Sequence, residues 1–225
     1  MSLLTNLVSY WKLDGNSNDS HGSSNGTDTA ITYSNANGII NNGAGFNGTS
    51  SKIEVGAITF GTTGTISFWI YGHATSEGDF YLDSTGSRLY LWNGGGAGIL
   101  TGLYMNFGAA DTGWVAMGLT PAAWNYVTIT WDGTNARFYK NAGLIGSAIA
   151  FAPTAITTTI SKFSTRLNDT AFNEAPLDEI GFWSRALTAG EITSLYNSGA
   201  GFAYPFSSFQ ASPMMHMMGT VGGIM

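Results

Sequence analysis

The sequence predicts an all-β domain, built as a two-sheet sandwich or jelly roll of antiparallel strands. Short runs of alternating apolar and polar residues recur along the chain, Gly, Asn and Asp separate them, and only one late segment has a helical period. Roughly a dozen such runs with frequent turns indicate antiparallel layers rather than a parallel sheet with crossover helices. Sandwiches of about 200–250 residues often form one domain, which suits a chain of 225 residues.

The strands follow from this alternation. In "TISFWIYG", residues 65–72, Ile66, Phe68 and Ile70 fall on one face and the residues between them on the other. The other runs that we expect to form strands are Val8–Leu13, Lys52–Val55, Asp79–Asp83, Arg88–Trp92, Leu103–Phe107, Trp114–Met117, Ile156–Phe163 and Leu177–Ser184.

A hairpin is predicted in "WNYVTITWDGTNARFYKNAG", residues 124–143. Apolar residues alternate in its first strand, Asp132-Gly133 supplies a left-handed turn, and residues 136–140 return as the second strand. The apolar face of the first strand consists of Val127, Ile129 and Trp131.

One short helix is predicted after the last strand. Thr188 is a suitable N-cap, and Glu191 three residues later completes a capping box. Gly199 stands where a C-terminal glycine cap belongs. Two helical turns do not persist alone in water, so we expect the helix to lie on the sandwich and close one end of it. The apolar stripe of this helix consists of Ile192, Leu195 and Tyr196.

Residues 1–206 are predicted to form the domain, and residues 207–225 a Met- and Gly-rich tail without strand or helix period. Several methionines surround His216 in this tail, and their flexible thioethers suit an adaptable contact with another subunit. Simple disorder and binding of Cu(I) by the Met and His side chains are the alternatives.

Composition excludes several functions. Hydrophobic residues make up 44% of the chain, which allows a substantial core, but charged residues only 10%. The net charge of −6 leaves no basic surface for phosphates, so nucleic acid is not an expected partner. No stretch suits a membrane span, there is no cysteine, and the first residues do not form a signal peptide. We therefore expect synthesis in a cytoplasm.

Four segments resemble the laminin-G-like, concanavalin A-like jelly-roll family in order and spacing. They are "LVSYWKLDGNSNDSHGSSNGT", "GTISFWI", the hairpin segment and "LDEIGFWSRALTAGEITSLYNSG", and the resemblance covers about residues 3–205. It implies a concanavalin A-like sandwich closed by the short helix, with the last strand near the N-terminal strand and Asp178 near the early Asp- and Asn-rich loop. It also implies a module that binds glycans or proteins, often with calcium, as in secreted enzymes, adhesins and virion proteins.

The early loop is a candidate calcium site. "LDGNSNDSHGSSNG" concentrates carboxylate and amide oxygens, the ligands that calcium takes. By resemblance, this loop and the strand that carries Asp178 flank calcium in some family members. The alternative is that these side chains accept hydrogen bonds from backbone amides in Asx turns. The candidate ligands are Asp14, Asp19, Asn25 and Asp178.

A candidate glycan site consists of aromatic residues in three neighbouring candidate strands. They alternate with apolar residues, so one face would be core and the other a platform on which sugar rings stack beside polar partners. The alternative is that these rings serve packing or contact with a neighbouring subunit. The predicted glycan-binding residues are Tyr81, Asp83, Tyr90, Trp92, Tyr104 and Asn106.

No active site is expected. Retaining glycosidases need two carboxylates about 5 Å apart. The nearest run, "EAPLDEIGF", does not fit, because Pro176 separates Glu174 from Asp178 and alternation would put Asp178 and Glu179 on opposite faces.

The resemblance, together with the lack of a signal peptide and of a partner enzyme domain, predicts a non-catalytic phage virion component. This would be a capsid decoration or fibre protein that presents a glycan-binding or adhesive surface. The expected partners are a surface polysaccharide and other virion subunits, the latter through residues 207–225. The alternatives are a bacterial carbohydrate-binding module and a glycoside hydrolase.

Overall fold

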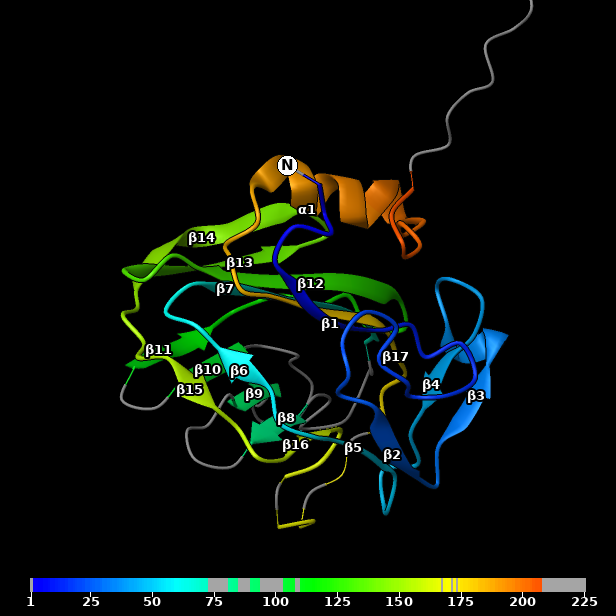
Figure 1. Ribbon diagram of the computed structural model, residues 1–225. Coiled ribbons are helices and arrows are strands. Elements are labelled where there is room, and N and C mark those ends of the chain that lie inside the picture. The colour runs from blue at the N-terminus through cyan, green and yellow to red at the C-terminus, as the bar shows by residue number, and fades with distance from the viewer. Residues whose placement is uncertain are drawn as a thin grey trace, which may run out of the picture.

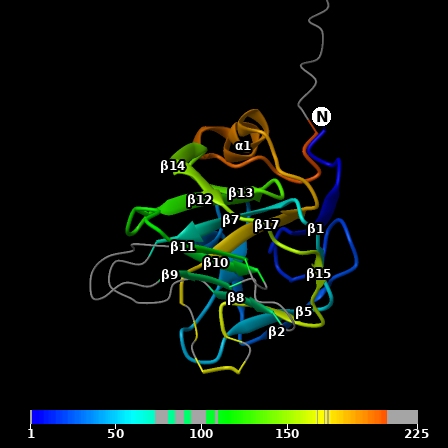
Figure 2. The same ribbon diagram turned by 90° about the vertical axis from the view of Figure 1, so that its left-hand side faces the viewer.

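Two antiparallel sheets face each other in the structure, a computed structural model (Figure 1). Figure 2 shows the two layers from the side, with the helix outside one of them. The structure describes residues 2–72, 81–84, 90–93, 103–107, 110–166, 168–170, 172 and 174–207.

The eight-stranded sheet, called sheet A, has the order β14-β13-β12-β7-β17-β4-β3, and β1 also pairs with β17. The two longest central strands, β7 and β12, pair along their full length from Gly64 opposite Trp131 to Tyr71 opposite Trp124. The strands of sheet A are β1 (Leu7–Trp11), β3 (Thr32–Ser34), β4 (Gly43–Gly45), β7 (Gly64–Tyr71), β12 (Trp124–Trp131), β13 (Asn135–Lys140), β14 (Gly143–Ala150) and β17 (Leu177–Trp183).

The seven-stranded sheet, called sheet B, has the order β11-β10-β9-β8-β16-β5-β2. A separate two-stranded sheet joins β6 (Thr59–Phe60) to β15 (Ile156–Thr157). The strands of sheet B are β2 (Gly26–Thr29), β5 (Lys52–Val55), β8 (Tyr81–Ser84), β9 (Tyr90–Asn93), β10 (Leu103–Phe107), β11 (Ala110–Val115) and β16 (Ser161–Phe163).

The inner core lies between the two sheets, and the alternation in the sequence predicted its members in the central strands. Side chains from both sheets form one buried cluster, because the inward residues of each strand are apolar. This cluster, called the inner core, includes Ile66, Phe68 and Ile70 of β7, Val127, Ile129 and Trp131 of β12, and Leu103, Met105 and Phe107 of β10.

A second apolar cluster covers the outer side of sheet A beneath the helix α1 (Ala189–Tyr196). Aromatic residues that face outward from these strands belong to it, since the helix and both ends of the described chain bury them. This cluster, called the cover cluster, includes Leu3, Leu7, Tyr10, Trp69, Tyr126, Trp183, Leu187, Ile192 and Leu195, with Tyr204 and Phe206 packed against it.

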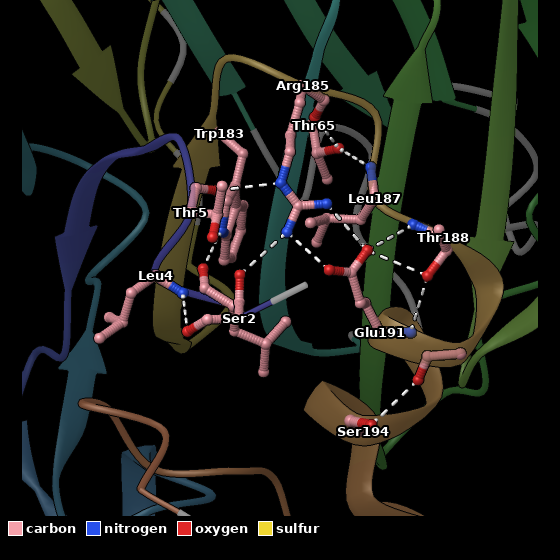
Figure 3. A network of polar contacts seen from close by, with 12 residues as sticks. Ser2, Leu4, Thr5, Thr65, Trp183, Arg185, Leu187, Thr188, Glu191 and Ser194 are labelled. Atoms are coloured by element: carbon pink, nitrogen blue, oxygen red, sulfur yellow. Dashed lines mark hydrogen bonds and ion pairs between the residues drawn. The ribbon is translucent and has the colours of Figure 1, made fainter.

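Arg185, which follows the last strand of sheet A, forms hydrogen bonds with both the helix and the N-terminal segment (Figure 3). Its guanidinium donates two hydrogen bonds to the Glu191 carboxylate, at 2.6 and 2.8 Å, and one to the Thr5 carbonyl at 2.9 Å. The indole N–H of Trp183 donates to the Leu3 carbonyl at 2.7 Å. The predicted capping box of Thr188 and Glu191 is confirmed. These contacts explain how so short a helix stays folded.

The structure corrects several predicted element bounds. The segment Ile156–Phe163 contains two strands in different sheets, β15 and β16, and the strand expected at Trp114–Met117 begins at Ala110 instead. Of the strands expected at Asp79–Asp83 and Arg88–Trp92, residues 79–80 and 88–89 lie outside the described residues. The strands β2, β3, β4, β6 and β14 were not predicted. β2, β3 and β4 are short and rich in Gly and small polar residues, β6 has only two residues, and β14 follows the predicted hairpin as an additional edge strand.

The helix also ends differently from the prediction. Its C-cap is Asn197, in the left-handed conformation with φ 47°, rather than Gly199. Asparagine tolerates this conformation better than other non-glycine residues, so it can end a helix as glycine does. Within the described residues, no helix is both long and apolar enough to cross a bilayer.

Candidate functional site

The outer face of sheet B carries aromatic side chains at the edge formed by β10 and β11. Leu103, Met105 and Phe107 point into the inner core, so the residues between them, Tyr104 and Asn106, lie on the opposite, outer face and are partly exposed. This confirms for β10 the predicted division into an apolar inner face and a polar and aromatic outer face.

Trp114 adds a second ring beside Tyr104. The two residues lie directly opposite each other on β11 and β10, and their ring centroids are 5.5 Å apart at an angle of 45°. Trp114 is 51% exposed, and it is the one aromatic side chain among the exposed large apolar residues in the described part of the chain. An exposed tryptophan next to a tyrosine is a surface that suits the apolar face of a ligand ring.

A β-bulge brings Asp111 to the same face as Trp114. Residues three apart on a regular strand lie on opposite faces, but β11 has one residue more than β10 between the pairs formed by Trp114 and Asp111. Gly113 adopts a φ of +62° at this point, and the Thr112 hydroxyl accepts the hydrogen bond of the Met105 N–H at 3.1 Å. The bulge thus turns a carboxylate toward the aromatic pair.

The Asp111 carboxylate is held by hydrogen bonds at both oxygens. One oxygen accepts the Tyr104 hydroxyl, and the other accepts the Gly113 N–H at 2.6 Å. Asp111 also lines a groove of about 320 Å³ at the open edge of the sandwich. The groove is lined by Ala110, Asp111, Ala150, Phe151, Ala152 and Thr154.

Sequence reasoning missed Trp114 and Asp111. Trp114 was expected at the start of a strand, and the pairing that sets it beside Tyr104 depends on the bulge. Its exposed position could not be read from its own segment, because the residues around it give no clean alternation.

The remaining predicted glycan-binding residues lie on β8 and β9, and their side chains are outside the described residues. The backbone register places Trp92 opposite both Tyr81 and Tyr104, and Tyr90 opposite Asn106. The three strands are therefore neighbours, as predicted. Asp83 lies opposite Lys162 on the next strand, β16.

Charged residues occupy the part of sheet B around β5 and β16. The Lys162 ammonium lies 2.8 Å from Asp169 and 3.7 Å from Glu54, and the Lys52 ammonium lies 2.7 Å from Asp169. Burial by itself raises the pKa of Asp169, but the hydrogen bonds from the two lysines outweigh it and lower that pKa below its usual value. This part of the sheet thus contains compensated charges.

The candidate calcium ligands in the early loop are occupied by backbone amides. Asp19 accepts hydrogen bonds from the N–H groups of Tyr10, His21, Gly22 and Ser24, at 2.8–3.0 Å. Burial raises the pKa of this carboxyl, but the amides outweigh it and lower the pKa overall. Asn25 accepts the N–H of Asp19 at 2.9 Å, so its oxygen is also engaged.

Asp14 and Asp178 lie on either side of another loop. Asp178 accepts the N–H groups of Ile39 and Ile40, at 2.8 and 3.0 Å, and Asp14 accepts that of Asn42 at 3.2 Å. Asp14 also pairs with Lys12 at 2.6 Å. Among the described residues, no three His, Cys, Asp or Glu side chains gather as a metal site would require. These oxygens accept hydrogen bonds from backbone amides, and calcium binding stays a prediction from the resemblance.

The structure corrects the expected orientation of Asp178 and Glu179. Asp178 pairs with Trp69 and Gly181 with Ser67, so two residues, Glu179 and Ile180, face one residue of β7. Glu179 has a φ of 49° at this bulge. Because Ile180 points into the inner core, both carboxylates lie on the outer side of sheet A rather than on opposite faces.

These two carboxylates are buried under the cover cluster. Burial raises the pKa of Asp178 to about 7, although three backbone N–H groups oppose the shift. Burial and then the charge of Asp178 raise the pKa of Glu179 well above its usual range, and Tyr10 opposes this only in part. Among the described residues, no donor reaches either Glu179 oxygen in hydrogen-bonding geometry. Both residues are almost completely buried, so these carboxylates are not open to a substrate.

Comparison with known families and structures agrees with this architecture. Residues 47–193 match the family model described as the concanavalin A-like lectin/glucanases superfamily. No curated protein sequence matches the chain significantly.

Solved structures with the same fold include domain 4 of an extracellular arabinanase from Geobacillus stearothermophilus in complex with arabinotriose. It is 19% identical with a TM-score of 0.65, and the match covers 83% of this chain and 96% of that one. Trypanosoma rangeli sialidase is 14% identical with a TM-score of 0.62, covering 88% and 34%. Botulinum neurotoxin type C, whose cell entry depends on interaction with two ganglioside molecules, is 16% identical with a TM-score of 0.57, covering 87% and 52%. The chain thus spans about a third of the sialidase and half of the toxin chain.

Proposed function

Because the chain belongs to the concanavalin A-like lectin/glucanase superfamily, we propose that it is a non-catalytic protein that binds a carbohydrate on the outer face of sheet B. The observation that carries this proposal is the exposed Trp114 beside Tyr104, with the fixed carboxylate of Asp111 at their edge. The C–H face of a sugar ring stacks on such an indole, and a carboxylate or amide accepts and orients its hydroxyl groups. Asn106 supplies an amide on the same face.

The arabinanase domain supports a binding role, because it was solved with arabinotriose and almost all of that chain aligns with this one. The ganglioside dependence of botulinum neurotoxin type C supports carbohydrate recognition in general, without indicating the charge of the ligand of this chain. At this identity, neither relative indicates which sugar is bound.

A hydrolase is the less favoured reading. Hydrolysis by paired carboxylates needs a second acid about 5–10 Å from the first across an open site. On the described outer face of sheet B, Glu54 and Asp169 are engaged by lysines, and Asp111 by Tyr104 and Gly113. The sialidase does not change this proposal, because the chain spans only 34% of that enzyme.

A finer proposal is that the chain is a phage virion component, a capsid decoration or fibre protein that presents this face to a surface polysaccharide. The resemblance to domains of virion proteins supports it, and so does the Met-rich composition of residues 207–225, which suits contact with another subunit. A bacterial carbohydrate-binding module is the alternative, and the likeness to the arabinanase domain favours it.

Replacing Trp114 tests the binding site. A panel of neutral and acidic oligosaccharides identifies the ligand, and calorimetry measures its Kd. The Trp114→Ala variant should weaken binding at least about tenfold, because an exposed aromatic platform supplies much of the binding energy in such sites. The Tyr104→Phe variant keeps the ring and should have a smaller effect. Leu144→Ala is the control, since Leu144 is 50% exposed on sheet A.

Wild-type affinity in the Trp114→Ala variant would contradict the proposed site, and release of reducing sugar from the ligand would contradict the non-catalytic assignment. The same titration with added calcium and with a chelator tests the calcium prediction. A calcium ion bound to the native state alone must raise the melting temperature.

A further inference from the structure

We infer that the face around Trp114 selects uncharged glycans and discriminates against anionic ones, such as sialylated, sulfated or uronic-acid-containing chains. This inference rests on the proposed function, and it adds the chemical class of the ligand.

The Asp111 carboxylate lies beside the aromatic pair of Tyr104 and Trp114. It lies within hydrogen-bonding distance of the Tyr104 hydroxyl, and the Tyr104 ring contacts that of Trp114. The Gly113 N–H holds the other carboxylate oxygen at 2.6 Å, so hydrogen bonds at both oxygens resist rotation of the side chain away from a bound ligand. A sugar stacked on Trp114 therefore lies next to a fixed negative charge, which can accept hydrogen bonds from hydroxyl groups but repels an anion.

The lysines of β5 and β16 in this sheet already form ion pairs. Lys52 and Lys162 are the lysines of β5 and β16, and both pair with the Asp169 carboxylate. Lys162 is also within 3.7 Å of Glu54 and has little exposure. Recruiting either ammonium to an anionic ligand would break an existing ion pair, which removes most of the gain.

The overall charge of the chain also opposes anionic ligands. The chain has a net charge of −6, so the long-range field also disfavours the approach of an anion. One added negative charge about 6 Å from Asp111 should weaken binding roughly threefold to a hundredfold, depending on how much water remains between the charges. This penalty should shrink as the salt concentration rises, whereas the affinity of a neutral ligand should hardly change.

Matched ligand pairs test the inference. Each pair consists of a neutral oligosaccharide and the same oligosaccharide with one sialic acid, sulfate or uronic acid, and Kd is measured at low and at high salt. The wild-type protein should bind the neutral member at least about threefold more tightly at low salt. The Asp111→Asn variant should reduce this ratio, because it removes the charge while the single amide oxygen can still accept one of the two hydrogen bonds, from the Tyr104 hydroxyl or the Gly113 N–H.

Asp28→Asn is the matched control. Asp28 lies on β2, at the other edge of sheet B, and also accepts a tyrosine hydroxyl, that of Tyr33 at 2.8 Å. This variant should keep the wild-type ratio. The charge selectivity would be overturned if the wild-type protein bound the anionic members equally or more tightly. If the Trp114→Ala variant also lost this binding, the proposed function would stay in place. Absence of binding to every neutral and anionic glycan would overturn the proposed function itself and the selectivity with it.

Discussion

Glu179 is a buried carboxylic acid whose loss of water Tyr10 and Lys12 offset only in part. The bulge in β17 places it beside Asp178 under the cover cluster, and both oxygens lack a partner among the described residues. Desolvation and the neighbouring carboxylate both favour its protonated form, so its pKa is raised well above its usual range. The residue thus lowers the stability of the fold whenever it must ionise.

The first prediction concerns the pH dependence that this pair causes. The pKa of Asp178 is raised to about 7, and the pKa of Glu179 is raised well above its usual value. Each group binds its proton more tightly in the native state than in the unfolded chain. Their contribution to stability is therefore fully present below about pH 4 and is lost as the pH rises through the raised pKa values.

The Glu179→Gln variant removes one of these two ionisable carboxyl groups. Its free energy of unfolding should exceed that of the wild type by about 1–3 kcal/mol at pH 8, and the difference should shrink toward pH 4. Urea unfolding at several pH values measures this. Glu174→Gln is the control, since Glu174 is exposed. A Glu179→Gln variant that is no more stable than the wild type at pH 8 would show that the carboxylate has a compensating partner.

At the scale of elements, the helix α1 depends on contacts outside itself. It has only eight residues, and an isolated helix of that length is not stable in water. Ile192 and Leu195 are buried against sheet A, and Arg185 joins Glu191 to the N-terminal segment. Because Glu191 serves both the ion pair and the capping box, one side chain connects the start of the helix to the last strand.

The second prediction follows from these two roles of Glu191. The Glu191→Gln variant should lose about 1–2 kcal/mol of stability at pH 7, because it breaks a largely buried ion pair. The Glu191→Ala variant should lose about 1 kcal/mol more, because the capping box is also lost. The hydrogen bonds from Arg185 lower the pKa of Glu191 to about 2, so the difference between wild type and Gln variant should disappear as the pH falls from about 4.5 toward 2.

Thr193→Ala is the control for these variants, since Thr193 is exposed and bonds only within the helix. Chemical denaturation followed by circular dichroism gives the required free energies. Equal stability of the Gln and Ala variants would mean that the capping box contributes little here.

At the scale of the whole molecule, the proposed glycan face and the end of the described chain lie on opposite sides. Trp114 lies on the outer face of sheet B, whereas Phe206 contacts Tyr10 and Trp183 in the cover cluster outside sheet A. Figures 1 and 2 show helix α1 on that same outer side of sheet A. A protein attached to a larger assembly near residue 207 could therefore keep its binding face directed away from the attachment.

The third prediction is that deleting residues 208–225 leaves glycan affinity and melting temperature unchanged. The deletion removes no described contact of the inner core or the cover cluster. If the tail docks to another subunit, sedimentation should show that only the full chain self-associates or binds particles. A monomer in both forms would argue against the virion proposal, and loss of glycan affinity on deletion would contradict the separation of the two sides.

The sequence alone was sufficient for features that depend on local patterns. Alternation in β7, β10 and β12 identified the inner-core residues, and the capping box fixed the start of the helix. The resemblance in the final segment correctly anticipated the pairing of β17 with β1. The core residues and the helix start could be predicted because each arises from residues a few positions apart, where the strand or helix period is decisive. The pairing of β17 with β1 joins distant segments, and only the family resemblance anticipated it.

Only the tertiary structure decided where the chemically important side chains point. The bulge in β11 brings Asp111 and Trp114 to one face, and the bulge in β17 brings Asp178 and Glu179 to another. Alternation read from the sequence assigned the second pair wrongly and did not detect the first. A bulge exists only relative to the partner strand, and one extra residue reverses the face of every residue beyond it. The pattern of a single strand determines whether it has an apolar face, but its pairing with neighbouring strands determines which polar residues share the other.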